Sequence, residues 1–441
     1  MILSRLRHAA ALGALAAAAV SCESGTDPEV QHLVDLVLDF CSDDVPVWMA
    51  YRNQGADWVR LTPNAEGTVT FTATNDVALA IVRQSGSDYA TEIVLAANTE
   101  LEGISGETCR EDIGSNTVHG TLSGVVGSQV SQVAMLFSTA YLGAAQTSFS
   151  LQGVPNRPVD LVASRYNITA TTQTADRVVI RRSESPAHNA TIPVIDFAAS
   201  TTLVPAAFGA TLSGIGTGDH AFLQNYFVSQ LGTVQLLANV EPAVNGSATM
   251  VALPQSALAA GDYHDLFLIA SDGSGASRGV ERYFRAAAPQ ALPLGPAMAN
   301  PTITEAGTSP YLRMRTRLTR QAEYARAMTA SFLQQQTFSV TRVDVTITSG
   351  YDASGTWDAT MPDLSGVSGW QNAWGLVNGG PLVEWTVTAF GARPELLFGG
   401  APSDGETVRF ASRQSGTNVR IARATRSSLS ARLPRSVGPF R

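Results

Sequence analysis

The feature that most restricts the fold is an alternation of apolar and polar side chains with a period of two residues. It is clearest from Thr68 to Thr74, where Val69, Phe71 and Ala73 face one side and four threonines face the other. Successive side chains of a β-strand point to opposite faces, so this pattern is typical of a strand with one buried face. Nearly every residue in the segment also favours strands. Similar short patterns recur along the chain and predict an all-β protein.

The spacing of these patterns predicts three or four antiparallel β-sandwich domains in series. At 441 residues the chain is too long for one ordinary core. We place the domains at residues 30–115, 116–200, 201–288 and 305–425. Prolines and alanines predict a linker at 289–304, and arginines and serines predict a flexible tail at 426–441. A helix stays an alternative to a strand at 33–38 and within 320–335.

The N-terminus has the pattern of a secretory signal. Two arginines precede an apolar run from Ala9 to Val20, which is too short to span a membrane, and small residues then lead to Cys22. The sequence Ala19-Val20-Ser21-Cys22 resembles a bacterial lipobox. This resemblance implies that residues 1–21 are removed as a signal peptide and that Cys22 is lipidated, with 22–29 as a polar tether.

The lipobox resemblance also implies an exported protein that contacts a membrane through its lipid anchor. Glu23 stands after the cysteine in place of the aspartate associated with inner-membrane retention, which favours the outer membrane. If Cys22 takes lipid, Cys41 and Cys109 remain, and an even pair in an oxidising compartment predicts a disulfide. The alternatives are two unpaired buried thiols or a metal site, for which two cysteines supply too few ligands.

Charge and composition exclude several functions. All 29 basic residues are arginines, so chemistry that needs a lysine, such as Schiff-base catalysis or a phosphate-binding P-loop, is absent. The net charge is −8, and because eight arginines and no acid follow Glu406, the preceding chain is more acidic still. An acidic body repels nucleic acid, so we predict no nucleic-acid partner. We expect no cofactor.

The segment Phe149–Tyr166 contains a phenylalanine-containing strand, a Gly/Pro turn and a second strand that ends in an apolar and alanine run. It resembles the transthyretin-like sandwich of carboxypeptidase regulatory-like domains. The resemblance implies a small Greek-key sandwich within 116–200, with a support or binding role and no catalytic residues.

Catalytic candidates are few. The stretch Gly275–Gly279 matches the Gly-x-Ser-x-Gly pattern of a nucleophile elbow, but no histidine follows His264 to act as the base, so we predict a hairpin loop there. On a strand, Asp262 and His264 would share one face, and His220 could complete a metal or acid–base site. The alternative for these three residues is a solvated polar turn.

Three further groups could bind ligands. Asp352, Asp358 and Asp363 could offer oxygen ligands to calcium, although their spacing matches no EF-hand loop. Arg313, Arg315 and Arg317 could project from one strand face towards a polyanion, or could instead meet acids on neighbouring strands. Trp370 and Trp374 could stack on sugars, or could belong to a sandwich core.

The sequence therefore predicts a cell-envelope lipoprotein that is not an enzyme. Its role would be structural, or the binding of a glycan, a polyanion or a protein. The alternative is an envelope hydrolase, directed at a glycan or an ester, with a site near His220 and His264.

Overall fold

The computed structural model describes residues 33–39, 45–65, 67–101, 114, 116–398 and 400–415. Within these ranges almost all regular structure is β-strand, which confirms the predicted all-β fold. The helical elements are single turns: α1 (Asn98–Leu101), α2 (Pro394–Leu397), η2 (Gln255–Ala257), η3 (Ala322–Tyr324) and η4 (Asn372–Trp374). No helix among the described residues is long and apolar enough to cross a membrane. The signal, Cys22, the tether, the Cys41 and Cys109 pair and residues 426–441 lie outside the described residues, so the expectations for them stay predictions.

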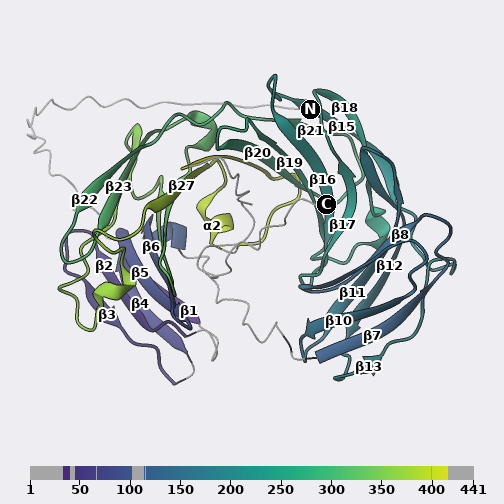
Figure 1. Cartoon of the computed structure of the whole chain (residues 1–441), viewed down its shortest axis with the longest axis horizontal. Helices are drawn as coiled ribbons and strands as arrows, with labels where there is room; N and C mark the ends of the chain where they lie inside the picture. The colour runs from purple at the N-terminus through teal and green to yellow at the C-terminus, as the bar shows by residue number, and fades with distance from the viewer. Residues whose placement is uncertain are drawn as a thin grey trace, which may run out of the picture.

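One continuous sheet of sixteen strands runs through the described chain, and Figure 1 shows it bent into an arch. Each strand is hydrogen-bonded to its neighbours. In spatial order the strands are β3 (Val59–Leu61), β2 (Trp48–Asn53), β5 (Asp76–Ser85), β6 (Asp88–Ala97), β25 (Val340–Thr348), β24 (Ala327–Gln335), β27 (Val383–Phe390), β28 (Thr407–Gln414), β20 (Ala276–Phe284), β19 (Tyr263–Ser271), β16 (His220–Val228), β17 (Val234–Val240), β12 (Thr172–Glu184), β11 (Val159–Ile168), β8 (Val130–Met135) and β9 (Ser138–Leu142).

Each segment predicted as a domain supplies four neighbouring strands of this sheet. From one end to the other the contributions come from 30–115, 305–425, 201–288 and 116–200, so the spatial order differs from the order in the chain. β6 and β25 join in parallel, whereas β28 pairs with β20 and β17 with β12 in antiparallel fashion. An unpaired strand edge leaves a row of backbone N–H and C=O groups without partners. Where two segments meet, hydrogen bonds between their outermost strands satisfy these backbone groups. The predicted units therefore form one continuous sheet.

Four smaller sheets in the described chain pack against the large one, and buried apolar clusters fill the space between the layers. Each predicted segment therefore forms sandwich-like layers. The segment 289–304, predicted as a linker, instead contains a strand that pairs in parallel with β15 and the start of another. The small sheets are β1 (Leu33–Asp39) with β4 (Thr68–Thr74); β7 (Asn116–Ser123) with β10 (Ser148–Val154), β13 (Ala190–Thr191) and β14 (Ile195–Asp196); β15 (Ala206–Ser213) with β18 (Gly246–Ala252) and β21 (Gln290–Pro293); and β22 (Thr302–Gly307) with β23 (Arg313–Thr319) and β26 (Thr356–Thr360).

The two faces of the large sheet carry different cores. On β5, Leu79 and Ile81 pack in the core between the large sheet and the small sheet of β1 and β4. Ala78 instead belongs to the core that contains Trp357 of β26. α2 lies on the inner side of the arch in Figure 1, and Phe398, next to it in the chain, packs with Leu79. A strand buried on both faces loses its polar positions, which explains the continuous apolar run of β5.

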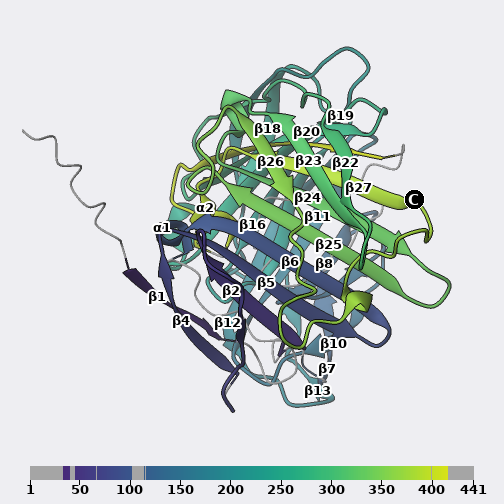
Figure 2. The same ribbon diagram turned by 90° about the vertical axis from the view of Figure 1, so that its left-hand side faces the viewer.

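Several local expectations can be compared with the strands seen in Figure 2. β4 spans Thr68–Thr74 with Val69, Phe71 and Ala73 buried, as the alternation predicts. Residues 33–38 form a strand, because β1 pairs with β4 in antiparallel fashion (Figure 2). The stretch 320–335 divides into the turn η3 and the strand β24.

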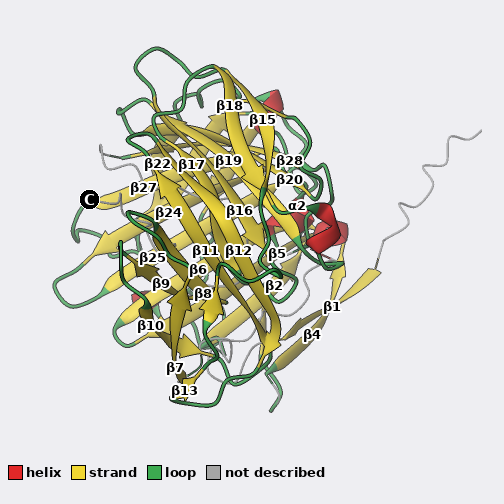
Figure 3. Ribbon diagram, turned by 90° about the vertical axis from the view of Figure 1, so that its right-hand side faces the viewer, coloured by secondary structure: helices red, strands yellow, loops and turns green. Residues whose placement is uncertain are grey.

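The segment that resembles a transthyretin-like sandwich forms β10 and β11, which lie in two different sheets. Both strands belong to the half of the arch that is turned towards the viewer in Figure 3. Leu151 of β10 and Leu161 of β11 pack in one core. The family assignment itself stays a prediction.

Candidate functional site

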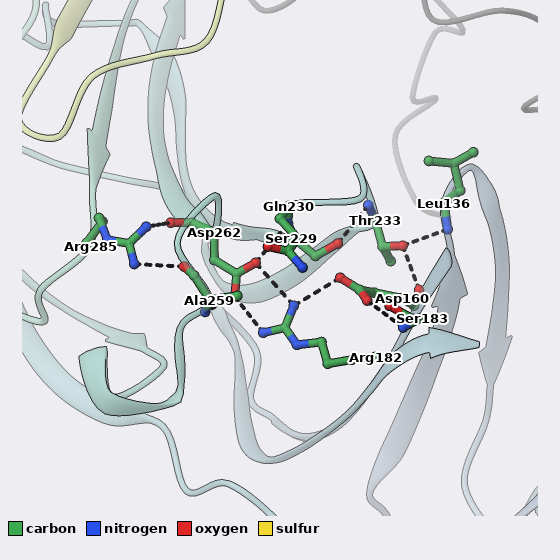
Figure 4. A network of polar contacts seen from close by, with 10 residues as sticks. All are labelled: Leu136, Asp160, Arg182, Ser183, Ser229, Gln230, Thr233, Ala259, Asp262 and Arg285. Carbon is green, nitrogen blue, oxygen red and sulfur yellow. Dashed lines mark hydrogen bonds and ion pairs between the residues drawn. The ribbon is translucent and has the colours of Figure 1, made fainter. Parts of the chain in front are cut away.

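Asp262 is the best-connected of the predicted site residues (Figure 4), and its carboxylate is fully buried. It lies just before β19 and pairs with Arg182 of β12, whose Nη2 is 2.5 Å from Asp262 Oδ2 and whose Nη1 is 3.1 Å from Oδ1. The same Nη1 is 3.0 Å from Oδ2 of buried Asp160. The backbone N–H groups of Gln230 and Ala259 each donate to Asp262 at 2.8 Å. The carboxylate therefore has partners at both oxygens.

The network extends from Asp160 through the backbone. Its Oδ1 accepts the N–H of Ser183 at 3.0 Å, and its carbonyl accepts the hydroxyl of Thr233 at 2.6 Å. Thr233 Oγ1 in turn accepts the N–H of Leu136 at 2.8 Å. The arrangement, drawn in Figure 4, ties segment 116–200 to segment 201–288. The network is therefore a structural contact between the two segments and not a binding site open to a ligand.

Arg182 stays charged in this setting. Burial lowers the pKa of its guanidinium, but the hydrogen bonds and charges of Asp262 and Asp160 outweigh burial and raise it. Arg285 adds a second cation, which donates to backbone carbonyls of Ala259, Ala260 and Asp262 at 2.5 to 2.7 Å.

His264 is fully buried in β19, and most of the residues that follow it in the strand are buried as well. In the sheet it lies opposite Phe227 of β16 and Phe284 of β20, and the ring centroids are 5.9 and 5.1 Å away. Burial lowers the pKa of its imidazole to about 4, although the carbonyls of Leu253 and Tyr226 oppose the shift. His264 is therefore neutral at neutral pH and acts as a core residue.

His220 lies at the other end of the same strand pair. It is opposite Ser271, whereas Phe227 is opposite His264, so roughly 23 Å of strand separates the two histidines. His220 is 64% exposed, and its Nε2 is 3.3 Å from Oε1 of Glu241. The structure does not bring His220 together with Asp262 and His264. The hydrolase hypothesis thereby loses the site on which it depended.

The Gly-x-Ser-x-Gly match lies mostly within β20, as an extended strand. Ser277 is buried, and its hydroxyl is 3.4 Å from that of Ser412 on β28. A Cβ placed on Gly279 would be 2.2 Å from Cζ of Phe410, so this glycine admits a ring from the neighbouring strand. The motif serves sheet packing, because a nucleophile elbow requires a sharp turn into a helix.

The three predicted calcium ligands do not converge. Asp352 accepts the backbone N–H of Ser354 at 2.8 Å, and Asp363 accepts that of Ser365 at 3.0 Å. Asp358 is used by arginines of the neighbouring strand. Across the part of the chain that the structure describes, no group of three or more His, Cys, Asp or Glu side chains could hold a metal ion.

The arginines of β23 each face an acid. Arg315 Nε is 2.7 Å from Asp358 Oδ1, and Arg317 Nε is 3.2 Å from Asp358 Oδ2. Arg313 Nη2 lies 3.7 Å from Asp363 Oδ2. The three arginines therefore pair with nearby acids, which is the second of the two predicted roles. These ion pairs leave the guanidinium charges partly neutralised.

Trp370 and Trp374 pack against another tryptophan. Their ring centroids are 5.1 and 6.0 Å from that of Trp48, and 5.5 Å from each other. Trp374 is buried, and Trp48 Nε1 donates to the carbonyl of Ser368 at 3.1 Å. Sugar recognition requires a free ring face, whereas these rings mainly cover one another.

A polar cluster that sequence reasoning missed lies on the large sheet. Asp265 of β19 is opposite Tyr283 of β20, and the Tyr283 hydroxyl is 2.6 Å from Glu281 Oε2. Burial raises the pKa of Tyr283 well above its usual value, and the charges of Glu281 and Asp265 add to this shift. The available signal was the alternation of Glu281 and Tyr283 on one strand. Their approach to Asp265 depends on register, which the sequence does not show.

Comparison with known proteins adds no assignment: no protein-family model matches the chain, and no curated protein matches it. The functional argument therefore depends on the chain's own residues and geometry.

Proposed function

We propose that the protein is a cell-envelope lipoprotein that is not an enzyme, in which the continuous sheet is a rigid scaffold that presents its loops to a binding partner. The observation that carries the proposal is the structural use of Asp262 and His264. A catalytic acid or base must come within hydrogen-bond reach of a substrate. Asp262 is instead saturated by Arg182 and two backbone N–H groups, and His264 lies between aromatic rings.

The location in the envelope is supported by the signal-like N-terminus and the lipobox resemblance at Cys22. β1 begins at Leu33, eleven residues after that cysteine. A fully extended chain of this length spans at most about 40 Å. A lipid on Cys22 would therefore hold the arch within a short distance of the membrane surface.

The anchor is tested by mass spectrometry of the N-terminal peptide from membrane-extracted protein. The expected peptide begins at Cys22 and carries diacylglycerol and acyl groups, and Cys22→Ala removes the lipid mass. Cys41→Ala is the matched control and leaves the lipidated peptide unchanged. A mature N-terminus elsewhere, without lipid, would contradict the proposed anchor.

The absence of enzyme activity needs its own test. Purified protein is assayed against ester and glycan substrates alongside the His220→Ala variant. We expect no turnover above the buffer rate for either protein. Turnover that His220→Ala abolishes would restore the hydrolase hypothesis.

A further inference from the structure

The small sheet of β22, β23 and β26 has an outward face rich in arginine and threonine. β22 and β23 lie on the outer side of the arch, whereas α2 lies on its inner side (Figure 1). Along β23, Thr316 and Leu318 are buried, so the residues that alternate with them point outwards. We give the name arginine face to these outward residues and to those opposite them: Arg313, Arg315 and Arg317 of β23, Thr302 and Thr304 of β22, and Asp358 and Thr360 of β26.

The arginine face carries more cations than its ion pairs balance. Asp358 serves two guanidinium groups: Arg315 bonds to both of its carboxylate oxygens, and Arg317 Nε lies 3.2 Å from Oδ2. Arg313 instead lies near Asp363, with 3.7 Å between Nη2 and Oδ2. Among the described residues of this face, three guanidinium groups therefore meet two carboxylates.

Arg317 is the cation with the most unused capacity. Its side chain is 56% exposed, and Asp358 is its one ion-pair partner among the described residues. Arg315 engages that carboxylate more closely, because its hydrogen bond is the largest cause of the lowered pKa of Asp358. Glu305 of β22 does not restore the balance, since it is paired with Met314, which alternates with the arginines. The terminal nitrogens of Arg317 thus remain available to an external anion.

Exposed hydroxyl groups flank the two outer guanidinium groups. On β22, Thr302 lies opposite Arg317 and Thr304 lies opposite Arg315. On β26, Thr360 lies opposite Arg315, and all three threonines are exposed. Side chains two residues apart on a strand are roughly 7 Å apart, so charge and hydroxyl groups repeat along this surface. Hydroxyl groups both donate and accept hydrogen bonds, as the hydroxyl groups of sugars do.

The face offers no apolar anchor. None of the exposed large apolar side chains of the described chain belongs to β22, β23 or β26. Protein partners usually bind through aromatic or apolar anchors, and insertion into a membrane surface also needs exposed apolar side chains. The chemistry of this face therefore favours a hydrophilic, anionic polymer.

We propose that the arginine face binds an acidic polysaccharide, with a carboxylate of the polymer held by Arg317 and Arg315 and with sugar hydroxyls bonded to the flanking threonines. A guanidinium group matches a carboxylate through two parallel hydrogen bonds. The pairing of Arg315 with both oxygens of Asp358 already has this geometry. The negative charge of the polymer complements the local excess of cations on a chain whose net charge is −8.

This inference names a ligand class for the proposed binding protein and rests on that proposed function. The two can fail separately. A loss of polysaccharide binding would leave the lipidated Cys22 peptide and the absence of turnover as they are, and a mature N-terminus without lipid would leave polysaccharide binding unchanged.

The experiment is biolayer interferometry of the purified full chain on immobilised polygalacturonate. The same polymer after full methyl esterification is the reference, because esterification removes its charge and keeps its sugar backbone. We expect binding to polygalacturonate that weakens as salt rises, since exposed charges are screened, and at least tenfold weaker binding to the ester.

Arg317→Gln should lower the affinity for polygalacturonate about tenfold, because a charged hydrogen-bond donor is lost. Arg317→Lys keeps the charge without the planar fork and should recover part of this loss. Asp358→Asn should raise the affinity up to about fivefold, because it leaves both guanidinium groups to the polymer. A row with a purely structural role would show no such gain.

The matched control is Arg393→Gln, which removes one charge from an arginine that is 41% exposed and whose Nε lies 2.8 Å from Glu406 Oε1. It lies directly before α2 and should bind polygalacturonate as the parent chain does. Circular dichroism checks that each variant is folded.

Three results would overturn the proposal. The first is equal affinity of Arg317→Gln and the parent chain, or an affinity that Asp358→Asn does not raise. The second is equal binding to the acidic and the esterified polymer. The third is binding to dextran sulfate without binding to polygalacturonate, which would assign the face to a sulfated ligand.

Discussion

Arg182 Nη2 lies 2.5 Å from Asp262 Oδ2, and this contact joins strand β12 to the turn that precedes β19. The guanidinium also reaches Asp160, so one cation serves two carboxylates that are fully buried. Buried ion pairs contribute little compared with apolar packing, but loss of one partner is costly because it leaves an uncompensated charge.

Arg182→Met should therefore lower the free energy of unfolding by about 3 kcal/mol, because two buried aspartates lose their cation. Urea denaturation followed by circular dichroism measures the change. Arg317→Met is the matched control, since exposed ion pairs contribute about 1 kcal/mol or less. A change for Arg182→Met no larger than the control would show that water reaches the carboxylates.

His264 makes stability depend on pH. Its pKa in the folded protein is about 4, below the ordinary value of 6.5, because the imidazole is buried. The unfolded chain then binds more protons between these pH values, so stability is complete above pH 6.5 and is lost as pH falls towards 4. The expected loss is about 3 kcal/mol.

His264→Phe should remove this part of the pH dependence, whereas exposed His220→Ala should leave it in place. Urea denaturation at pH 7 and at pH 4.5 measures both variants. An unchanged pH dependence in His264→Phe would mean that the loss at low pH comes from other groups.

Gly279 should not tolerate a side chain. A Cβ there would be 2.2 Å from the Phe410 ring, so Gly279→Ala should destabilise the fold by about 1–3 kcal/mol through overpacking. Gly209, also on a strand, has no atom within 4 Å of such a Cβ. Gly209→Ala should therefore stabilise by up to about 1 kcal/mol. Thermal unfolding compares the two, and equal effects would refute the steric explanation.

The shared sheet predicts that the segments do not separate cleanly. A chain that ends at Pro293 keeps β1 to β21 but lacks β25 and β28, the partners of β6 and β20. Two strand edges are then exposed, and we expect oligomers or aggregates. Size-exclusion chromatography with light scattering measures this. A stable monomer would indicate that the segments fold as independent domains.

Local patterns determined much of the fold. The alternation at Thr68–Thr74 specified β4 and its buried face, because side-chain direction in a strand depends only on neighbouring residues. Most hydrogen-bonded neighbours are close in the chain, so each predicted segment supplies adjacent strands, whereas the number of domains stays a prediction.

The tertiary structure alone decided which segments meet, and with them the fate of the candidate site residues. Strand order depends on edges brought together across hundreds of residues, as in the pairing of Thr91 with Val343. The sequence alone does not distinguish the environments of His220 and His264. Strand register places His220 in solvent and His264 between two phenylalanines. The amino-acid type limits the chemistry that a side chain can perform. Its burial and the charges around it decide which role it takes, and these two properties arise only when distant strands pair.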